Sequence, residues 1–143
     1  MSNWDTMIDA ARQGVLPSMF PADFELPMVA PVDLGKEAAS LLRQAPEHTA
    51  TSHTEGPERY TPRDVAHAFA AGLGHPVDVA VTHRAEWVDT FRKLGFSEKA
   101  ACSFAGMTAA TLDGGADKPF HAKQGQTSLA DYIGNLIGRM EVN

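Results

Sequence analysis

The two tyrosines, Tyr60 and Tyr132, are the first residues to test for chemistry, because a phenol beside a lysine can take part in hydride transfer. A tyrosine four positions before a lysine would place the phenol beside an ammonium group on one helix face, which lowers the pKa of the phenol. Tyr60 is followed at this spacing by Asp64, and Tyr132 is followed by Leu136. We therefore predict that the chain carries no catalytic residue of this kind.

Glycine-rich phosphate loops are the next candidates, because glycines let the backbone approach a phosphate closely. The sequence contains neither G-x-G-x-x-G nor G-x-x-x-x-G-K-[ST]. The Gly-Leu-Gly-His stretch at 72–75 ends a predicted helix, whereas a dinucleotide fingerprint lies between a strand and the start of a helix. We expect no cofactor-binding residues in the isolated chain.

The sequence also lacks the motifs that would indicate metal binding or nucleophilic catalysis. The six histidines form no H-x-x-x-H pair, and no pair of cysteines is available as ligands, so we predict no metal site. Ser103 lies inside a predicted helix and has no G-x-S-x-G context. The single cysteine, Cys102, stands among alanines and a phenylalanine, which favours a small buried apolar side chain.

The composition indicates whether the chain can be a nucleic-acid-binding, membrane-spanning or secreted protein. The 143 residues include 12 basic and 18 acidic side chains, with a net charge of -6, and the basic residues are scattered singly. A nucleic-acid binder would cluster them on one face, so nucleic acid is not expected as a partner. No apolar run approaches the roughly 20 residues that span a bilayer. No secretion signal is visible at the start, and a lone cysteine suits a reducing compartment, so we expect a cytoplasmic protein.

Hydrophobic periodicity and capping signals predict a helix-rich α+β fold in a single domain over 1–143. The clearest helix follows Thr61, where Pro62 takes the first position, Asp64 completes a capping box, and Gly74 ends the helix. Asp33 is read as the cap of an earlier helix. About six helices and two or three short strands are expected: helices at 3–13, 33–44, 62–73, 84–94, 97–112 and 128–140, strands at 48–55 and 77–81, and a linker at 113–127.

The proline-rich segment 15–31 has no helical period and is unusually apolar for a loop. Such a segment either packs on the core or lines a pocket. For each of its residues, ordinary core packing is the alternative to a role in a pocket. Combined with large apolar residues of later helices, it gives six candidates for lining a ligand site: Met19, Phe20, Phe24, Trp87, Phe104 and Met107.

The order of short motifs resembles the C-terminal part of NmrA-like proteins, an atypical extended group of short-chain dehydrogenases/reductases. The stretch 55–96 has the pattern of that family: Glu-Gly-Pro, then Tyr-Thr-Pro, a helix with Asp-Val-Ala, then Leu-Gly-His-Pro-Val, a strand, and a helix with Glu-Trp. Upstream, Asn-Trp, Gly-Val-Leu-Pro-Ser and Pro-Met-Val-Ala-Pro-Val-Asp-Leu-Gly match the stretch that follows the central strands of the family. The resemblance covers most of 3–112.

The resemblance implies that this chain corresponds to the substrate-binding, C-terminal portion of the family. In the family this portion follows a Rossmann domain that binds NAD(P), and no such domain is found in this sequence. The first expectation is a homologue without catalysis of its own, acting as a ligand-binding or protein-interaction module. The alternatives are one half of a split NAD(P)H-dependent oxidoreductase, whose Rossmann part lies on another chain and completes the NAD(P) site, or a truncated remnant. A homodimer or a Rossmann-type partner is expected, through 3–15, 16–31 or the edge of 48–55.

Overall fold

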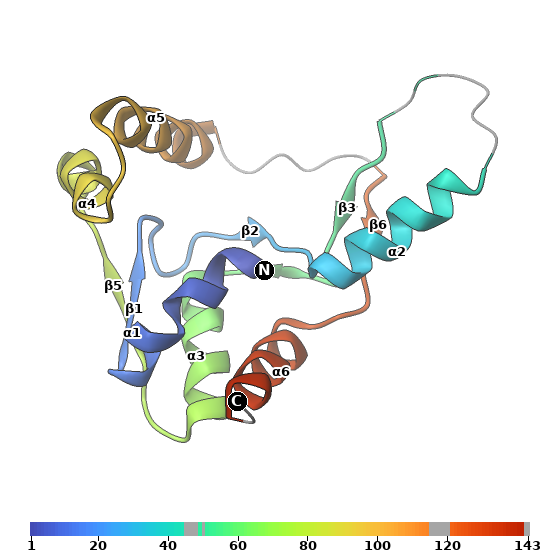
Figure 1. Cartoon of the computed structure of the whole chain (residues 1–143), viewed down its shortest axis with the longest axis horizontal. Helices are drawn as coiled ribbons and strands as arrows, with labels where there is room; N and C mark the ends of the chain where they lie inside the picture. The colour runs from blue at the N-terminus through green and yellow to red at the C-terminus, as the bar shows by residue number, and fades with distance from the viewer. Residues whose placement is uncertain (45–48, 50, 115–120, 142–143) are drawn as a thin grey trace.

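The computed structural model describes residues 1–44, 49, 51–114 and 121–141. The helix-rich α+β class is confirmed, with α-helices joined by very short strands (Figure 1). The helical elements are the 3-10 helices η1 (Ser2–Met7) and η2 (Arg84–Glu86) and the α-helices α1 (Ile8–Arg12), α2 (Pro31–Leu42), α3 (Pro62–Leu73), α4 (Trp87–Lys93), α5 (Glu98–Gly114) and α6 (Leu129–Glu141). None of the described helices is both long enough and apolar enough to cross a membrane.

Within the described residues, the strands form three separate pairs. The parallel pairs are β1 (Val15–Ser18) with β5 (Asp78–Val81), and β3 (Thr54–Glu55) with β6 (Lys123–Gln124). The antiparallel pair is β2 (Leu26–Pro27) with β4 (Arg59–Tyr60). Each pair joins segments that are distant in the sequence, so the strand pairs provide contacts between distant parts of the chain.

Helices α3 and α6 cross at the centre of the core. Phe69 and Val65 of α3 and Ile133 of α6 are completely buried, and Leu16 of β1 packs in the same cluster. The side chain of Ile137 lies so close to Gly72 that a Cβ at that position would touch it. Removal of large apolar surface from water at this crossing is the main source of stability.

The capping signals correctly placed the ends of α3. Thr61 Oγ1 accepts the backbone N–H of Asp64 at 3.2 Å, and the Asp64 carboxylate accepts the backbone N–H of Thr61 at 2.8 Å. Gly74 ends the helix with φ 75°, a left-handed conformation that glycine adopts without strain. The strand predicted after this helix is also present, as β5.

Three predictions about secondary structure need correction. The segment 15–31 is not loop throughout, because Val15–Ser18 pairs with β5. The helix predicted at 33–44 begins at Pro31, with Ala30 at the N-cap, so Asp33 is not the cap. Of the strand predicted at 48–55, only Thr54–Glu55 is strand; 48 and 50 lie outside the described residues.

The predicted linker at 113–127 and the predicted burial of Cys102 also differ from the structure. Helix α5 continues to Gly114, and Lys123–Gln124 forms β6, while 115–120 lies outside the described residues. Cys102 is exposed. Ala101 takes the fully buried position, and each step along a helix turns the side chain by about 100°, so Cys102 points away from the packed face.

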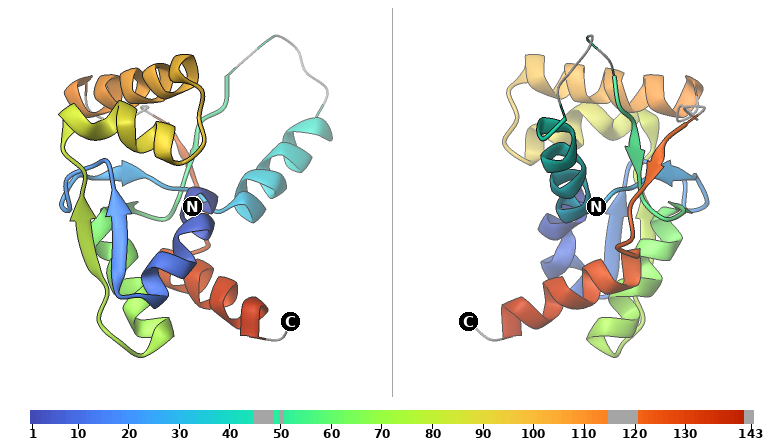
Figure 2. Two further views of the ribbon diagram at one scale, coloured as in Figure 1. Left: turned by 60° about the vertical axis from the view of Figure 1, so that its left-hand side comes forward. Right: turned by 90° about the vertical axis from the view of Figure 1, so that its right-hand side faces the viewer.

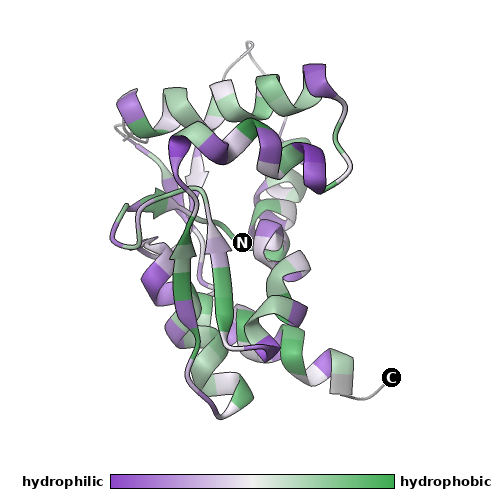
Figure 3. Ribbon diagram, turned by 90° about the vertical axis from the view of Figure 1, so that its left-hand side faces the viewer, coloured by the Kyte–Doolittle hydropathy of each residue, from purple (hydrophilic) through white to green (hydrophobic). Residues whose placement is uncertain are grey.

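One face of the β1–β5 pair is packed and the other is uncovered. Leu16 and Val79 lie opposite each other and belong to the core, beside α1 and α3. Val15, Pro17 and Ala80 alternate with them and are exposed. Figure 3 shows this strand pair in front of the helices that pack behind it. Parallel sheets normally have both faces covered, so the open face is unusual for an isolated unit.

Candidate functional site

The six residues predicted to line a ligand site lie in two groups. Phe20 and Phe24 stack with ring centroids 5.5 Å apart, and Met19 is half-buried beside them in the chain. In the second group, on α4 and α5, Trp87 is buried and donates its indole N–H to the backbone oxygen of Thr82 at 3.0 Å.

The other two predicted residues, Phe104 and Met107, are exposed on α5, where the ring of Phe104 packs against Phe91 and Phe96. The three cavities considered below are lined by other residues. The role of the six residues in ligand binding stays a prediction.

Among the residues that the structure describes, the buried charged side chains lie where α2 meets the β3–β6 pair (Figure 2, right). Asp33 and Glu37 are one turn apart on α2 and are only 6% and 9% exposed. Residues at this spacing share one helix face. Helix α2 therefore packs against the body of the protein through two carboxylates, where most helices would present leucines.

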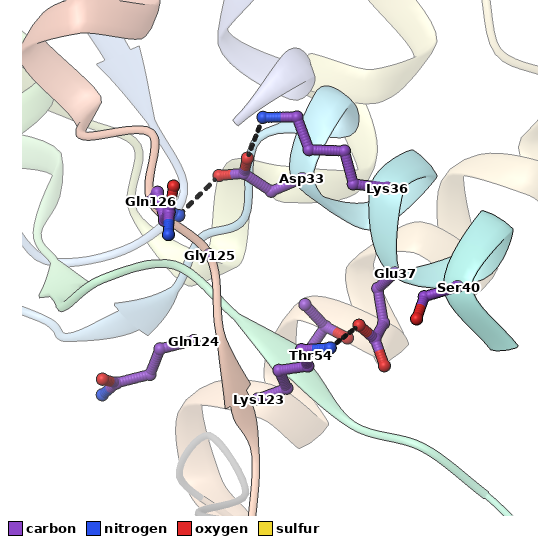
Figure 4. A pocket seen from close by; sticks show the side chains of 9 residues that line it. All are labelled: Asp33, Lys36, Glu37, Ser40, Thr54, Lys123, Gln124, Gly125 and Gln126. Carbon is purple, nitrogen blue, oxygen red and sulfur yellow. Dashed lines mark hydrogen bonds and ion pairs between the residues drawn. The ribbon is translucent and has the colours of Figure 1, made fainter.

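Asp33 fastens α2 to the segment that leads into α6. Its Oδ2 accepts the backbone N–H of Gln126 at 2.9 Å (Figure 4) and the backbone N–H of Thr127 at 2.7 Å. The ammonium group of Lys36 donates to Oδ1 at 3.4 Å. The backbone hydrogen bond from Thr127 is the main cause that holds the pKa of Asp33 below its usual value of 3.8. The carboxylate is thus charged at neutral pH and acts as an acceptor for two backbone donors.

Gly125 is required by the same contact. A Cβ on Gly125 would lie 2.7 Å from Asp33 Oδ2 and 3.0 Å from Asp33 Cβ. Any side chain there would push the strand away from α2. The glycine and the aspartate are 92 positions apart, and neither residue alone indicates the contact.

Glu37 makes the second charged contact, an ion pair with Lys123 of β6 (Figure 4). Beside these pairs lies a polar cavity of about 210 Å³, with Ser40 and Thr54 also in its wall. Its two carboxylates already have ammonium partners in Lys36 and Lys123. This balance of charge suits a structural junction between helix and strands better than a site for a charged ligand.

A larger cavity of about 500 Å³ lies between η1, the beginning of α2 and α6. In its wall the hydroxyl of Tyr132 donates to both carboxylate oxygens of Asp5, at 2.9 and 3.0 Å. Burial, followed by this hydrogen bond, raises the pKa of Tyr132 to about 12. Asn135 and Arg139 follow Tyr132 along the same face of α6 and also line the cavity.

Sequence reasoning missed the pairing of Asp5 with Tyr132. The two residues are 127 positions apart, and no local pattern joins them. The only available signal was the position of Tyr132 on the amphipathic C-terminal helix, next to its apolar stripe.

Tyr60 lines a third cavity, of about 370 Å³, between α3 and the beginning of α6. Its hydroxyl oxygen accepts the backbone N–H of Leu129 at 3.2 Å. Burial raises the pKa of this phenol above 10.0, with a further contribution from Glu58. Within the part of the chain that the structure describes, no three His, Cys, Asp or Glu side chains lie close enough to hold a metal ion.

Comparison with solved structures shows that the chain shares its fold with part of two reductases. No protein-family model matches the sequence, and no curated protein is significantly similar to it. Among solved structures, the NADPH complex of a NADPH-dependent quinone oxidoreductase from Escherichia coli matches with a TM-score of 0.76 and 18% identity, over 94% of this chain and 50% of that chain. A triphenylmethane reductase from Citrobacter sp. matches with a TM-score of 0.71 and 15% identity, over 94% of this chain and 48% of that chain.

The chain thus spans about half the length of these reductases. Identity at this level shows a shared fold and does not transfer an activity. The part of the expectation that these structures bear out is the fold, which the chain shares with about half of each reductase.

Proposed function

We propose that this chain is a non-catalytic homologue of the substrate-side, C-terminal portion of NmrA-like reductases and acts as a protein-interaction module. The observation that carries the proposal is the orientation of α2. Its buried face holds Asp33 and Glu37, whereas Leu34, Leu41 and Leu42 are 49%, 43% and 87% exposed.

The exposed leucines make one continuous surface. Positions 34, 38, 41 and 42 follow the i, i+4, i+7, i+8 spacing of a single helix face, and all four side chains there are apolar and exposed. We call these four residues the α2 stripe. An apolar stripe turned outward indicates an interaction surface, because its burial against a partner releases water from apolar atoms. We propose that the occupant is the α2 stripe of a second copy, giving a homodimer.

The absence of catalysis is supported by both tyrosines. A hydride-transfer tyrosine needs a lowered pKa, which requires a cation beside the phenol. Burial and neighbouring carboxylates instead raise the pKa of Tyr60 and of Tyr132. Each hydroxyl is also engaged in a structural contact, with Leu129 and with Asp5 respectively.

The mass of the protein in solution tests the interaction surface. We expect the chain to be a dimer by size-exclusion chromatography with light scattering at high micromolar concentration. Leu41→Glu should give a monomer, because a charge in the centre of an apolar contact costs on the order of several kcal/mol. The matched control is Val15→Glu, which places the same charge on the open face of the β1–β5 pair. A wild-type monomer would contradict the homodimer.

The second candidate is one half of an NAD(P)H-dependent oxidoreductase. It is favoured by the open face of the β1–β5 pair and by the coverage of about half of two reductases. A Rossmann-type portion would then cover Val15, Pro17 and Ala80 and supply the NAD(P) site. Under this candidate, Val15→Glu and not Leu41→Glu would disrupt the assembly.

A further inference from the structure

We propose that α2 pairs with α2 of a second copy in antiparallel orientation, with Leu42 of each copy seated over Gly35 of the other. This inference rests on the homodimer proposed above and adds the arrangement of its two helices. The surface concerned is open, because no described helix or strand lies on the side of α2 away from the β3–β6 pair (Figures 1 and 2). The arrangement follows from the direction in which each side chain leaves the helix.

Ala38 lies at the centre of the α2 stripe. Successive residues of an α-helix are turned by about 100°, so Leu34 and Leu41 stand about 40° and 60° to one side of Ala38. Leu42 and Gly35 stand about 40° and 60° to the other side. All five residues are exposed. Gly35 leaves free space beside the stripe, because a Cβ at this position would meet nothing within 4 Å.

This face of α2 suits a second copy electrostatically. Within about 60° of Ala38 the helix carries no charged residue. Asp33 and Glu37 are buried against the body of the protein and pair with lysines, and Lys36 and Arg43 stand about 140–160° away from Ala38. A two-fold contact opposes a surface with itself, so any charge in it would meet a like charge. The uncharged face avoids this repulsion, and a charged partner would find no counter-charge in it.

Two-fold symmetry allows the two helices to run antiparallel or parallel. In an antiparallel pair, Leu42 lies opposite the partner's Gly35, and Leu41 lies opposite the partner's Leu34. In a parallel pair, Leu41 would meet the partner's Leu42, so four leucines would crowd together at one end of the contact. The antiparallel pair spreads the leucines over the whole helix. It also places the positive end of each helix dipole beside the negative end of the other, which is the favourable orientation.

The expected contact is specific but small. The short side chain of Ala38 near the two-fold axis lets the leucines on either side reach the partner helix. A single pair of 12-residue helices buries little area compared with stable protein interfaces. We therefore expect the dimer to dissociate with a constant of roughly micromolar size.

Gly35→Ala tests the seat of Leu42. In the single chain the new methyl group meets nothing within 4 Å, and alanine favours a helix over glycine, so the fold should be no less stable. In the dimer the methyl group would take the space under the partner's Leu42, so the dissociation constant should rise at least about tenfold. Gly106→Ala makes the same change at an open position of α5 and should leave the constant unchanged. Sedimentation equilibrium measures both variants.

Disulfide trapping tests the orientation of the two helices. All variants carry Cys102→Ser, because Cys102 is exposed and could form disulfides of its own. Mixed Gly35→Cys and Leu42→Cys chains should form a heterodisulfide on mild oxidation, which intact mass spectrometry distinguishes from either homodimer. Mixed Gly35→Cys and Leu34→Cys chains should not, because these positions face each other only in a parallel pair and are about 10 Å apart along the axis of an antiparallel one.

The outcomes separate this arrangement from the homodimer itself. A wild-type monomer would contradict the homodimer and the arrangement with it. A wild-type dimer that Gly35→Ala does not weaken would overturn the arrangement and leave the homodimer standing. The same conclusion would follow from a dimer that is trapped through Leu34→Cys in place of Leu42→Cys, or through neither.

Discussion

Replacing Asp33 with alanine should lower the free energy of unfolding by about 3 kcal/mol, because the change leaves two backbone donors without their charged acceptor. The N–H groups of Gln126 and Thr127 both donate to Asp33 Oδ2, and the side chain of Thr127 also interacts with this carboxylate. Loss of the acceptor should loosen α2 and the segment that leads into α6 together. Chemical denaturation followed by circular dichroism measures the effect.

Two further variants make this prediction specific. Asp33→Asn keeps one side-chain oxygen as an acceptor and should lose roughly half as much stability as Asp33→Ala. Asp9→Ala removes an exposed carboxylate that pairs with Arg12 three positions later, and it should change stability by less than about 0.5 kcal/mol. A loss in Asp33→Ala no larger than that in Asp9→Ala would show that the contact does not hold α2 in place.

The same contact has a defined dependence on pH. The folded state holds the pKa of Asp33 below the ordinary value of 3.8, so its contribution to stability is present above that value. The contribution is lost as the pH falls below 3.8 and through the lower pKa of the folded state. The stability difference between wild type and Asp33→Asn should therefore be constant from neutral pH to about pH 5 and shrink below about pH 4.

Gly56→Ala should cost about 1–3 kcal/mol, since a new methyl group would overpack a rigid site. A Cβ on Gly56 would overlap the backbone oxygen of Met28 and lie 3.3 Å from its carbonyl carbon. Met28 is buried and directly follows β2, which pairs with β4, so its backbone has little freedom to move away. The conformation of Gly56 is not left-handed, and close approach of two backbone segments alone explains the glycine.

Gly134→Ala is the matched control for this prediction. Gly134 lies in α6, and a Cβ there would meet nothing within 4 Å. Alanine forms helices better than glycine, so this variant should gain up to about 1 kcal/mol. Thermal unfolding of both variants gives the comparison, and equal stability of Gly56→Ala and wild type would disprove the proposed overlap.

The local signals of the sequence predicted helix ends well. The capping box of Thr61 and Asp64 and the glycine stop at Gly74 act within one or two turns, so their residues specify them directly. Ser128 and Asp131 likewise exchange hydrogen bonds at the beginning of α6. The Glu-Gly-Pro motif marked a real structural feature, although its physical basis, the contact with Met28, was not visible in the sequence.

Contacts between distant segments could not be predicted in this way. Strand β1 contains Pro17 and lacks an alternating pattern, and it exists because β5 lies beside it. Asp33 was read as a helix cap because its real partners, Gln126 and Thr127, are 93 and 94 positions away. The leucines of α2 share one helix face, but periodicity alone does not tell that this face points outward.

We propose that this chain, whose fold is shared with part of two reductases, binds no dinucleotide by itself. Calorimetric titration of NADPH into the isolated chain tests this claim most directly, with the Escherichia coli quinone oxidoreductase as the positive control. We expect no saturable heat up to about 1 mM NADPH for a chain that circular dichroism shows to be folded. Saturable binding with a Kd in the micromolar range would contradict it.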